Sequence, residues 1–461
     1  MNEIFNYLKR NGILKKNQPN IRNILKLSPK KIFDITKHLV EIGRKATYSP
    51  RPSQFTHFAS MHLGGGKEAC SNPTCRIERT DSLARFALMY SDKVFIHNYF
   101  IDYDRFLNKG KTLNPEIINN FIADISVLSH LSPLIESNKI SIFTPEKHIC
   151  PFCLAKMHFG KSAAQRMDSS IRSLSRDYLK NTKVNLQFSN GHYGLHCTGP
   201  ELFFEHGGGY VDFCKLPPLL ANNKKILKLA ERYKSIPINQ RTVKKLGFLE
   251  GMHVRDTVRN ICYEIMASKA LGTSFLTNRE LDVRFLEGLT KKSDISDNNK
   301  LALQYLTSEV PFLNNVNLKD LIKLREKEEA SFVLFRHALI QTISEFKAKR
   351  GSLTAQDAKE IYSDVLQPRL AKLDRTVKSA MQSLRVKPLR SVIAAAGVIS
   401  FGAFMGFLST EVKPIIQALG ASVGGVNFIK NLLSIGDTED AIKTDSMYFL
   451  WRVKKLSRKC R

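Results

Sequence analysis

Two short cysteine pairs, Cys70-Ser-Asn-Pro-Thr-Cys75 and Cys150-Pro-Phe-Cys153, are separated by a long stretch of chain. Pairs of this kind are typical of the two turns that supply four thiolates to a structural, tetrahedral zinc ion. One Zn2+ held by all four cysteines would join two distant segments. We therefore expect residues 51–215 to form an α+β domain around this zinc clasp.

Two other interpretations of the cysteines stay open. All four could be reduced and partly buried without any metal, and Cys150-Pro-Phe-Cys153 also follows a strand-like run, as a redox-active Cys-x2-Cys motif does. The first ten residues lack the apolar core of a signal peptide, which favours a cytoplasmic protein with reduced thiols. Association with the inner membrane is an open alternative.

The chain is strongly basic, with a formal net charge of +29 over 461 residues. This length predicts two or three domains, and the surplus favours nucleic acid, anionic lipid or another polyanion as partner. Lysine-rich usage in an AT-rich bacterial genome is the competing explanation. We expect a basic helical arm over 1–50 and a basic helical region over 216–295. The candidate polyanion-binding residues are Lys224, Lys225, Lys228, Arg232, Lys244 and Lys245.

Local patterns predict several elements before residue 215. Residues 51–66 are rich in Pro, Ser, His and Gly and predict a loop, whereas 93–97 and 139–143 predict strands. Helices are expected over 115–130 and 160–181. The strongest β signal is a hairpin of 184–188 and 192–196 around Asn190-Gly191, because Asn-Gly supplies the positive φ angles of a tight turn. Residues 201–204 and 209–213 are candidates to extend that sheet.

The C-terminal half predicts mainly helices. Residues 291–300 form the best linker candidate, and 296–390 a helical domain in which apolar residues from Leu318 to Ile343 recur every three or four positions. Pro368 should end or kink its helix. Pro311 to Arg325, together with Phe332 and Phe335-Arg336-His337, resembles a segment of uncharacterised bacterial proteins. The resemblance covers residues 310–340 and implies a bacterial setting without a catalytic role.

Residues 391–433 are rich in Gly and Ala and predict an apolar helical hairpin, followed by a basic tail over 434–461. The first run, 391–409, has no charge and approaches the roughly 20 residues that a membrane-spanning helix needs. Small residues that allow close helix packing are Gly402, Gly406, Gly420 and Gly424. Burial in the core of a helical bundle explains the same pattern without a membrane.

Catalytic motifs are weak. His206-Gly-Gly-Gly209 and Gly420-x-Ser422-x-Gly424 resemble esterase elements, but no histidine follows Ser422 to activate it. Leu63-Gly-Gly-Gly-Lys67 lacks the spacing of a phosphate loop and reads better as a turn. His97, Asp102 and Asp104 are candidates for a metal-dependent nuclease, which Glu345-Phe-Lys347 supports only superficially. The cluster His192, His196, Cys197, His206 and Cys214 alternates along strands, so its side chains should not all converge.

These observations predict a zinc-knuckle-containing mixed α/β N-terminal region and a mostly α-helical C-terminal half with the apolar hairpin. The leading hypothesis is a bacterial, non-enzymatic zinc-binding sensor or effector without a small-molecule cofactor, with phage defence as one setting. It would recognise a polyanion, a protein partner or a second copy of itself, and its hairpin would insert into a membrane. The alternative is a soluble nucleic-acid-binding protein or the basic subunit of a larger complex. A metal-dependent nuclease is less favoured.

Overall fold

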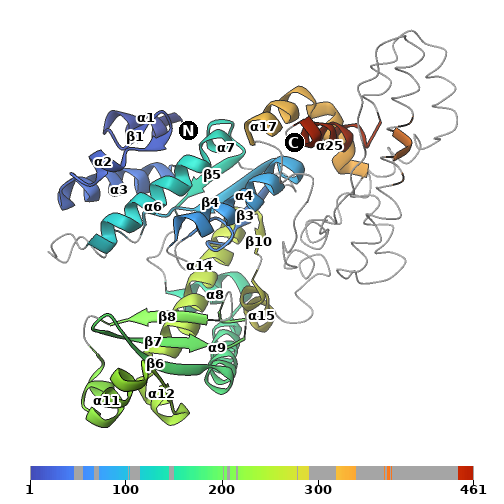
Figure 1. The fold of residues 1–461 in the computed structure, drawn as a ribbon. Helices are drawn as coiled ribbons and strands as arrows, with labels where there is room; N and C mark the ends of the chain where they lie inside the picture. Colours follow the sequence, from blue (N-terminus) through green and yellow to red (C-terminus); the bar gives the residue numbers. More distant parts are fainter. Residues whose placement is uncertain are drawn as a thin grey trace, which may run out of the picture. The chain divides into compact units, whose positions relative to one another are not determined.

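The computed structural model describes residues 2–45, 56–66, 72–101, 103, 115–144, 150–200, 202–204, 208–213, 216–277, 279–289, 318–338, 368, 371–373, 375 and 445–459. These residues form a mixed α/β structure that contains one two-stranded and two four-stranded sheets (Figure 1). The chain divides into two compact units. Unit 1 comprises Met1–Pro145, Ser268–Asn278 and Ser296–Arg461, and unit 2 comprises Glu146–Ala267 and Arg279–Ile295. The predicted 51–215 domain therefore contributes residues to both units.

The centre of unit 1 is a parallel sheet with the spatial order β10 (Ser274–Leu276), β3 (Thr56–Ala59), β4 (Lys93–His97) and β5 (Ile140–Phe143). Phe58 lies opposite Phe95 on one side and Phe275 on the other. Parallel sheets are covered on both faces, which explains why nearly every residue of these strands is buried. The helix α4 (Pro73–Tyr90) connects β3 to β4, and α6 (Pro115–His130) with α7 (Ser132–Glu136) connects β4 to β5.

The order of strands along the chain is that of a doubly wound sheet. The chain runs outward from β3 through β4 to β5 and then returns to the other side of β3 as β10. Between β5 and β10 it builds most of unit 2. The second unit is therefore an insertion that precedes the last strand of the parallel sheet.

The N-terminal elements belong to the core of unit 1. They are α1 (Asn2–Arg10), the hairpin of β1 (Leu14–Lys15) and β2 (Gln18–Pro19), α2 (Ile21–Ile24) and α3 (Pro29–Arg44), which Ser28 caps by accepting a hydrogen bond from Lys31 N. Ile4, Leu8 and Leu39 lie in the same buried cluster as residues of the sheet. The 1–50 range is thus mostly helical, and its apolar side chains help to build the core.

Two helices from the C-terminal half complete this core. Leu321, Phe332 and Phe335 are fully buried along and after α17 (Leu318–Lys327), as the helical spacing predicts. The ring of Phe449 in α25 (Tyr448–Lys459) lies 5.1 Å from that of Phe332. Arg325 is also fully buried and donates from Nη1 to the carbonyl oxygens of Ala87 and Leu88 at the end of α4, at 2.7 and 3.0 Å. Leu88 lies in the last turn of α4, where carbonyl groups lack a partner within the helix, and Ala87 O also accepts a hydrogen bond from the N–H of the C-cap residue Ser91.

Unit 2 contains an antiparallel sheet with the order β8 (Gly208–Asp212), β7 (His192–Thr198), β6 (Lys183–Ser189) and β9 (Ser235–Ile238). The predicted β6–β7 hairpin is confirmed. Asn190 and Gly191 have φ angles of 51° and 79°, which is the conformation that a two-residue hairpin turn requires. Two helices, α8 (Pro151–Phe159) and α9 (Ala163–Asn181), precede the sheet in the chain.

The remaining elements of unit 2 are mostly short helices. They are α10 (Pro218–Ala221), α11 (Lys224–Tyr233), α12 (Gln240–Leu246), α13 (Phe248–Glu250), the π-helical turn η2 (Gly251–Asp256), α14 (Thr257–Ala270) and α15 (Glu280–Leu289). The last residues of α14 belong to unit 1. The ring of Tyr178 in α9 contacts the rings of Phe204, which lies between β7 and β8, and His253, which lies in η2.

The structure confirms the elements predicted at 93–97, 115–130, 139–143, 160–181 and 209–213 with small shifts at their ends. The loop predicted over 51–66 is wrong at Thr56–Ala59, which form the central strand β3, and residues 202–204 do not extend the sheet. β9 and β10 lie in the range that was expected to be helical. β9 can include Pro237 because β9 is an edge strand with a neighbour on one side only. Proline has no backbone N–H to donate, and edge strands tolerate this loss.

Several predicted features lie outside the described residues. These are Cys70, Asp102, Asp104, His206, Cys214, Glu345, Lys347, the linker 291–300 and the hairpin with Gly402, Gly406, Gly420 and Gly424. Within the part of the chain that the structure describes, no helix is both long enough and apolar enough to cross a membrane. The membrane hypothesis for residues 391–433 stays a prediction.

Candidate functional site

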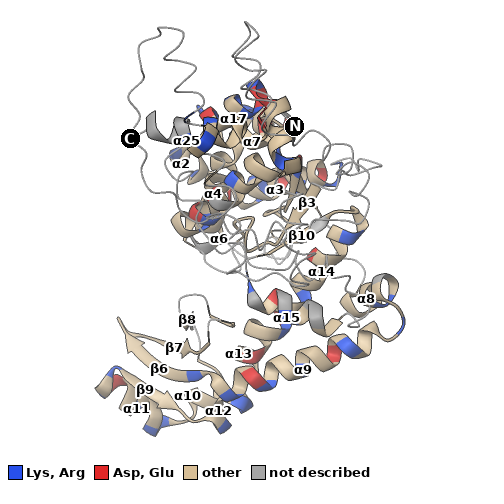
Figure 2. Ribbon diagram, turned by 90° about the vertical axis from the view of Figure 1, so that its right-hand side faces the viewer, with Lys and Arg blue, Asp and Glu red and all other residues tan. Residues whose placement is uncertain are grey.

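The six basic residues singled out from the sequence come together on two neighbouring helices of unit 2. Lys224, Lys225, Lys228 and Arg232 lie on α11, Lys244 and Lys245 lie on α12, and all six are exposed. The edge strand β9 connects the two helices. Figure 2 shows blue segments along both. We call these six residues the basic surface.

Local sequence explains why these helices begin where they do. Asn223 and Asn239 are their N-caps, and each side-chain oxygen accepts a hydrogen bond from a backbone N–H in the first turn. Ala230 and Val243 are buried and anchor the inner sides of α11 and α12. The lysines and the arginine therefore face solvent because the apolar positions of each helix face inward.

The charge of the basic surface is not compensated within the described chain, where none of its six residues forms an ion pair. The nearby acid, Glu231, accepts a hydrogen bond from the hydroxyl of Tyr193. α11 also exposes Leu229 and Tyr233, and the Arg232 guanidinium lies 5.3 Å from the centre of the Tyr233 ring. Positive charge next to an exposed aromatic ring suits an anionic partner that also carries flat apolar groups.

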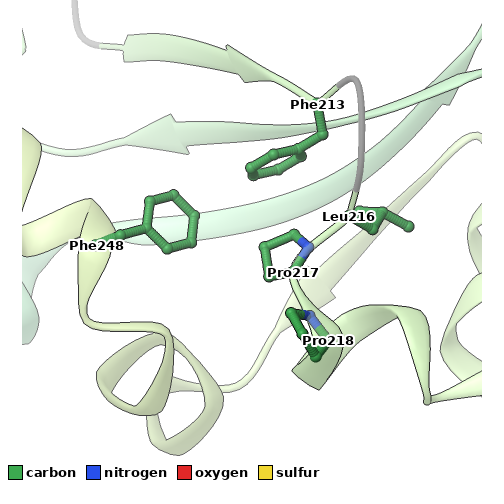
Figure 3. A pocket seen from close by; sticks show the side chains of 5 residues that line it. All are labelled: Phe213, Leu216, Pro217, Pro218 and Phe248. Carbon is green, nitrogen blue, oxygen red and sulfur yellow. The ribbon is translucent and has the colours of Figure 1, made fainter.

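An apolar pocket is formed by residues that flank these helices in the chain. Its volume is about 450 Å³, and it is lined by Phe213, Leu216, Pro217, Pro218 and Phe248. Figure 3 shows the rings of Phe213, Phe248 and Pro217 around a common space. The two phenyl rings lie edge to face, with 5.8 Å between their centres. Pro218 begins α10 just before α11, and Phe248 begins α13, which is separated from the end of α12 by one residue.

The second cysteine pair lies at the start of α8, also in unit 2. Cys150 is the N-cap, Pro151 follows in the first turn, and the sulfurs of Cys150 and Cys153 are 3.7 Å apart. Two thiolates bound to one tetrahedral zinc ion lie about 3.8 Å apart, so the pair is compatible with half of a zinc site. The same separation suits a reduced dithiol. The nearby backbone N–H of Cys153 lowers the pKa of Cys150, whereas the neighbouring Cys150 thiol raises the pKa of Cys153.

The zinc clasp as a whole stays a prediction. Cys75 lies in α4 of unit 1, Cys150 and Cys153 lie in unit 2, and Cys70 is outside the described residues. No group of three or more possible metal ligands is found among the residues that the structure describes.

If the clasp binds zinc, chelator-treated protein should take up about one Zn2+ per chain, because four thiolates satisfy a structural tetrahedral site. Replacing Cys150 and Cys153 together with serine should abolish this uptake. Elemental analysis after dialysis provides the measurement, and Cys197→Ala is the control, since Cys197 is buried in β7. A folded wild-type protein that takes up no zinc would exclude the clasp.

The carboxyl edge of the parallel sheet in unit 1 holds a buried polar network that the sequence did not reveal. Arg76 is fully buried, donates from Nε to the carbonyl oxygen of Gly65 at 2.7 Å and forms an ion pair with Asp124 of α6. The hydroxyl of Tyr103 donates to the other Asp124 oxygen at 2.6 Å. Tyr99 donates to the carbonyl oxygen of Gly64. These bonds fix the glycine-rich turn after β3 to α4 and α6.

Doubly wound sheets bind ligands at this edge, where the strand order reverses. In this chain the glycines of the turn have a packing role. Gly65 has a φ angle of +79°, and a Cβ atom there would lie only 2.4 Å from Thr80 Cγ2. Gly66 N donates to the carbonyl oxygen of Met61 at 2.6 Å, which closes the turn. The prediction of a turn rather than a phosphate loop at residues 63–66 agrees with these contacts.

The remaining catalytic candidates do not converge within the described chain. His97 is buried at the end of β4, and its proposed partners Asp102 and Asp104 lie outside the described residues. His196 and Cys197 are neighbours in β7 and therefore lie on opposite faces of the sheet. Burial raises the pKa of Cys197 to about 11, so its thiol is protonated at neutral pH.

The six basic residues were singled out from the sequence, and the structure shows that they are exposed; their binding of a polyanion stays a prediction, and the pocket was not foreseen. Phe213, Phe248 and the Pro217-Pro218 pair carry no charge or motif, and they come together only through the fold. The Pro217-Pro218 pair indicates a rigid turn at this place in the chain, but it does not indicate a pocket. Comparison with models of protein families, with curated proteins and with solved structures gives no significant match to this chain.

Proposed function

We propose that this protein binds nucleic acid through the basic surface on α11 and α12. The observation that carries the proposal is the exposure of all six basic side chains on two adjoining helices, without ion-pair partners among the described residues. Nucleic acid neutralises such a cluster and releases its own counterions, which drives association. The net charge of +29 supports the same class of partner.

An anionic membrane surface is the main competitor for such a cluster. Helices that lie on membranes bury a continuous apolar face beside the basic one. α11 exposes two large apolar side chains, Leu229 and Tyr233, and the other exposed positions of this helix are mainly charged. This composition favours a polyanion in solution.

A triple variant with glutamine in place of Lys224, Lys228 and Lys245 should bind a single-stranded oligonucleotide more weakly, and its binding should depend less on salt. Each lost phosphate contact lowers the slope of log K against log salt by about 0.7, so the triple variant should lose about 2 from the slope. Fluorescence anisotropy over roughly 50–200 mM salt measures both quantities.

The matched control removes three exposed lysines elsewhere, Lys26, Lys156 and Lys161, and changes the net charge equally. It should retain the wild-type slope. An equal loss in both triple variants would mean that only the overall charge matters. Wild-type protein that does not bind at about 50 mM salt, or that binds anionic vesicles instead, would contradict the proposal.

Binding of a polyanion is also one part of the wider hypothesis of a zinc-dependent sensor with a membrane-inserting hairpin. Its other parts depend on Cys70 and on residues 391–433 and stay predictions. The proposal includes no catalytic step.

A further inference from the structure

We infer that the pocket lined by Phe213, Pro217 and Phe248 takes an unpaired nucleobase, so that the protein prefers single-stranded over double-stranded nucleic acid. The inference rests on the proposed function and specifies its ligand. The pocket and the basic surface belong to the same unit, and the residues that line the pocket flank α10 to α12 in the chain.

The shape and chemistry of the pocket suit a flat aromatic group. Phe213 and Phe248 are only half-buried, and their rings, with the ring of Pro217, surround the space of about 450 Å³ (Figure 3). All five lining side chains are apolar. Stacking on aromatic rings contributes to the binding of single strands without requiring a particular base, because every base has a π-face.

The position of the pocket also argues for a base rather than a lipid chain or an apolar peptide. The pocket residues are close in the chain to the basic surface: Lys224 comes six residues after Pro218, and Lys245 comes three residues before Phe248. A ligand that fills the pocket and contacts both lysines must combine a compact apolar group with negative charge. A nucleotide within a strand has this combination at every position. A base in a duplex is stacked and paired, so it reaches such a pocket only at the cost of unpairing.

The decisive test compares three ligands of equal length: a single-stranded oligonucleotide, the same strand with abasic sites in place of its bases, and the duplex. The first two carry the same charge, whereas the duplex carries about twice as much and should still bind no more tightly than the complete single strand. Wild-type protein should bind the complete strand about 5- to 150-fold more tightly than the abasic strand, which is the effect of losing one stacked base. Phe248→Leu should bind the two strands equally and keep the salt dependence of the wild type. Tyr210→Leu, at an exposed ring in β8 of the same unit, is the matched control and should behave as wild type.

The outcomes separate this inference from the proposed function. Equal binding of complete and abasic strands by wild-type protein, with a normal salt dependence, would overturn the base pocket and leave the basic surface intact. No binding to any of the three ligands would overturn both. The comparison of ligands uses wild-type protein alone, so equal binding of complete and abasic strands would overturn the base pocket even if Phe248→Leu does not fold. Tyr233→Leu separates the pocket from the exposed ring on α11, because it should keep the preference for the complete strand.

Discussion

Replacing Asp124 with alanine is expected to lower the free energy of unfolding of unit 1 by about 3–5 kcal/mol. The carboxylate is fully buried, forms an ion pair with the equally buried Arg76 and accepts the hydroxyl hydrogen of Tyr103. Its loss leaves a guanidinium in the interior that keeps its hydrogen bond to the carbonyl oxygen of Gly65 and its position 5.7 Å from the centre of the Tyr99 ring, with no negative charge to balance it among these contacts. Chemical denaturation, followed by a probe of the parallel sheet, measures the effect.

The control for this prediction is Asp168→Ala. It removes the same charge from an ion pair with Arg172 in which both side chains are largely exposed, so it should cost less than about 1 kcal/mol. Replacing Arg76 with methionine and Asp124 with leucine together should restore part of the stability, because no charge then remains buried at this pair. An Asp124→Ala protein as stable as wild type would show that the network does not support the fold.

Acid should destabilise unit 1 through His57. Complete burial in β3, close to the ring of Phe86, lowers the pKa of His57 to about 3; Asp92 opposes the shift and Arg336 adds to it. The unfolded chain takes up this proton below a pH of about 6.5, whereas the folded chain does not. Folding is therefore favoured above pH 6.5, and the contribution falls by about 1.4 kcal/mol per pH unit as the pH drops towards 3.

The measurement is the free energy of unfolding at several pH values between about 6.5 and 4.5. Between these two pH values the free energy of unfolding of His57→Leu should fall by roughly 2–3 kcal/mol less than that of wild type, since leucine has no proton to gain. His192→Leu, at an exposed position beside the β6–β7 turn, serves as the control and should keep the wild-type slope. An identical slope in His57→Leu and wild type would mean that other groups cause the acid sensitivity.

The elements that the sequence predicted correctly have strong local signals. The β6–β7 hairpin depends on Asn190-Gly191, and β4 and α6 have the length and apolar spacing of their types. β3 was missed because it has four residues, includes a histidine and stands among prolines and glycines that indicate a loop. Its neighbours in space, β4 and β10, are distant in the chain, and only pairing with them makes Thr56–Ala59 a strand.

In the candidate site, too, features with a local sequence signal could be predicted and features that depend on distant contacts could not. The six basic residues were predicted because exposed lysines on an amphipathic helix follow directly from the order of residues. Phe213 and Phe248 are separated by a strand and three helices, so no local pattern connects them. The partnership of Arg76 with Asp124 spans 48 positions and depends on how α4 and α6 pack on the sheet. Long-range contacts of this kind carry no signal in a single sequence.

The insertion of unit 2 ahead of β10 has a consequence for biosynthesis. When Pro145 leaves the ribosome, β3 has β4 as a neighbour, but its other edge has no partner until residues 274–276 are made. At about 5–20 residues per second, this interval is on the order of ten seconds. During that time the nascent chain presents an open, apolar strand edge of the kind that promotes aggregation.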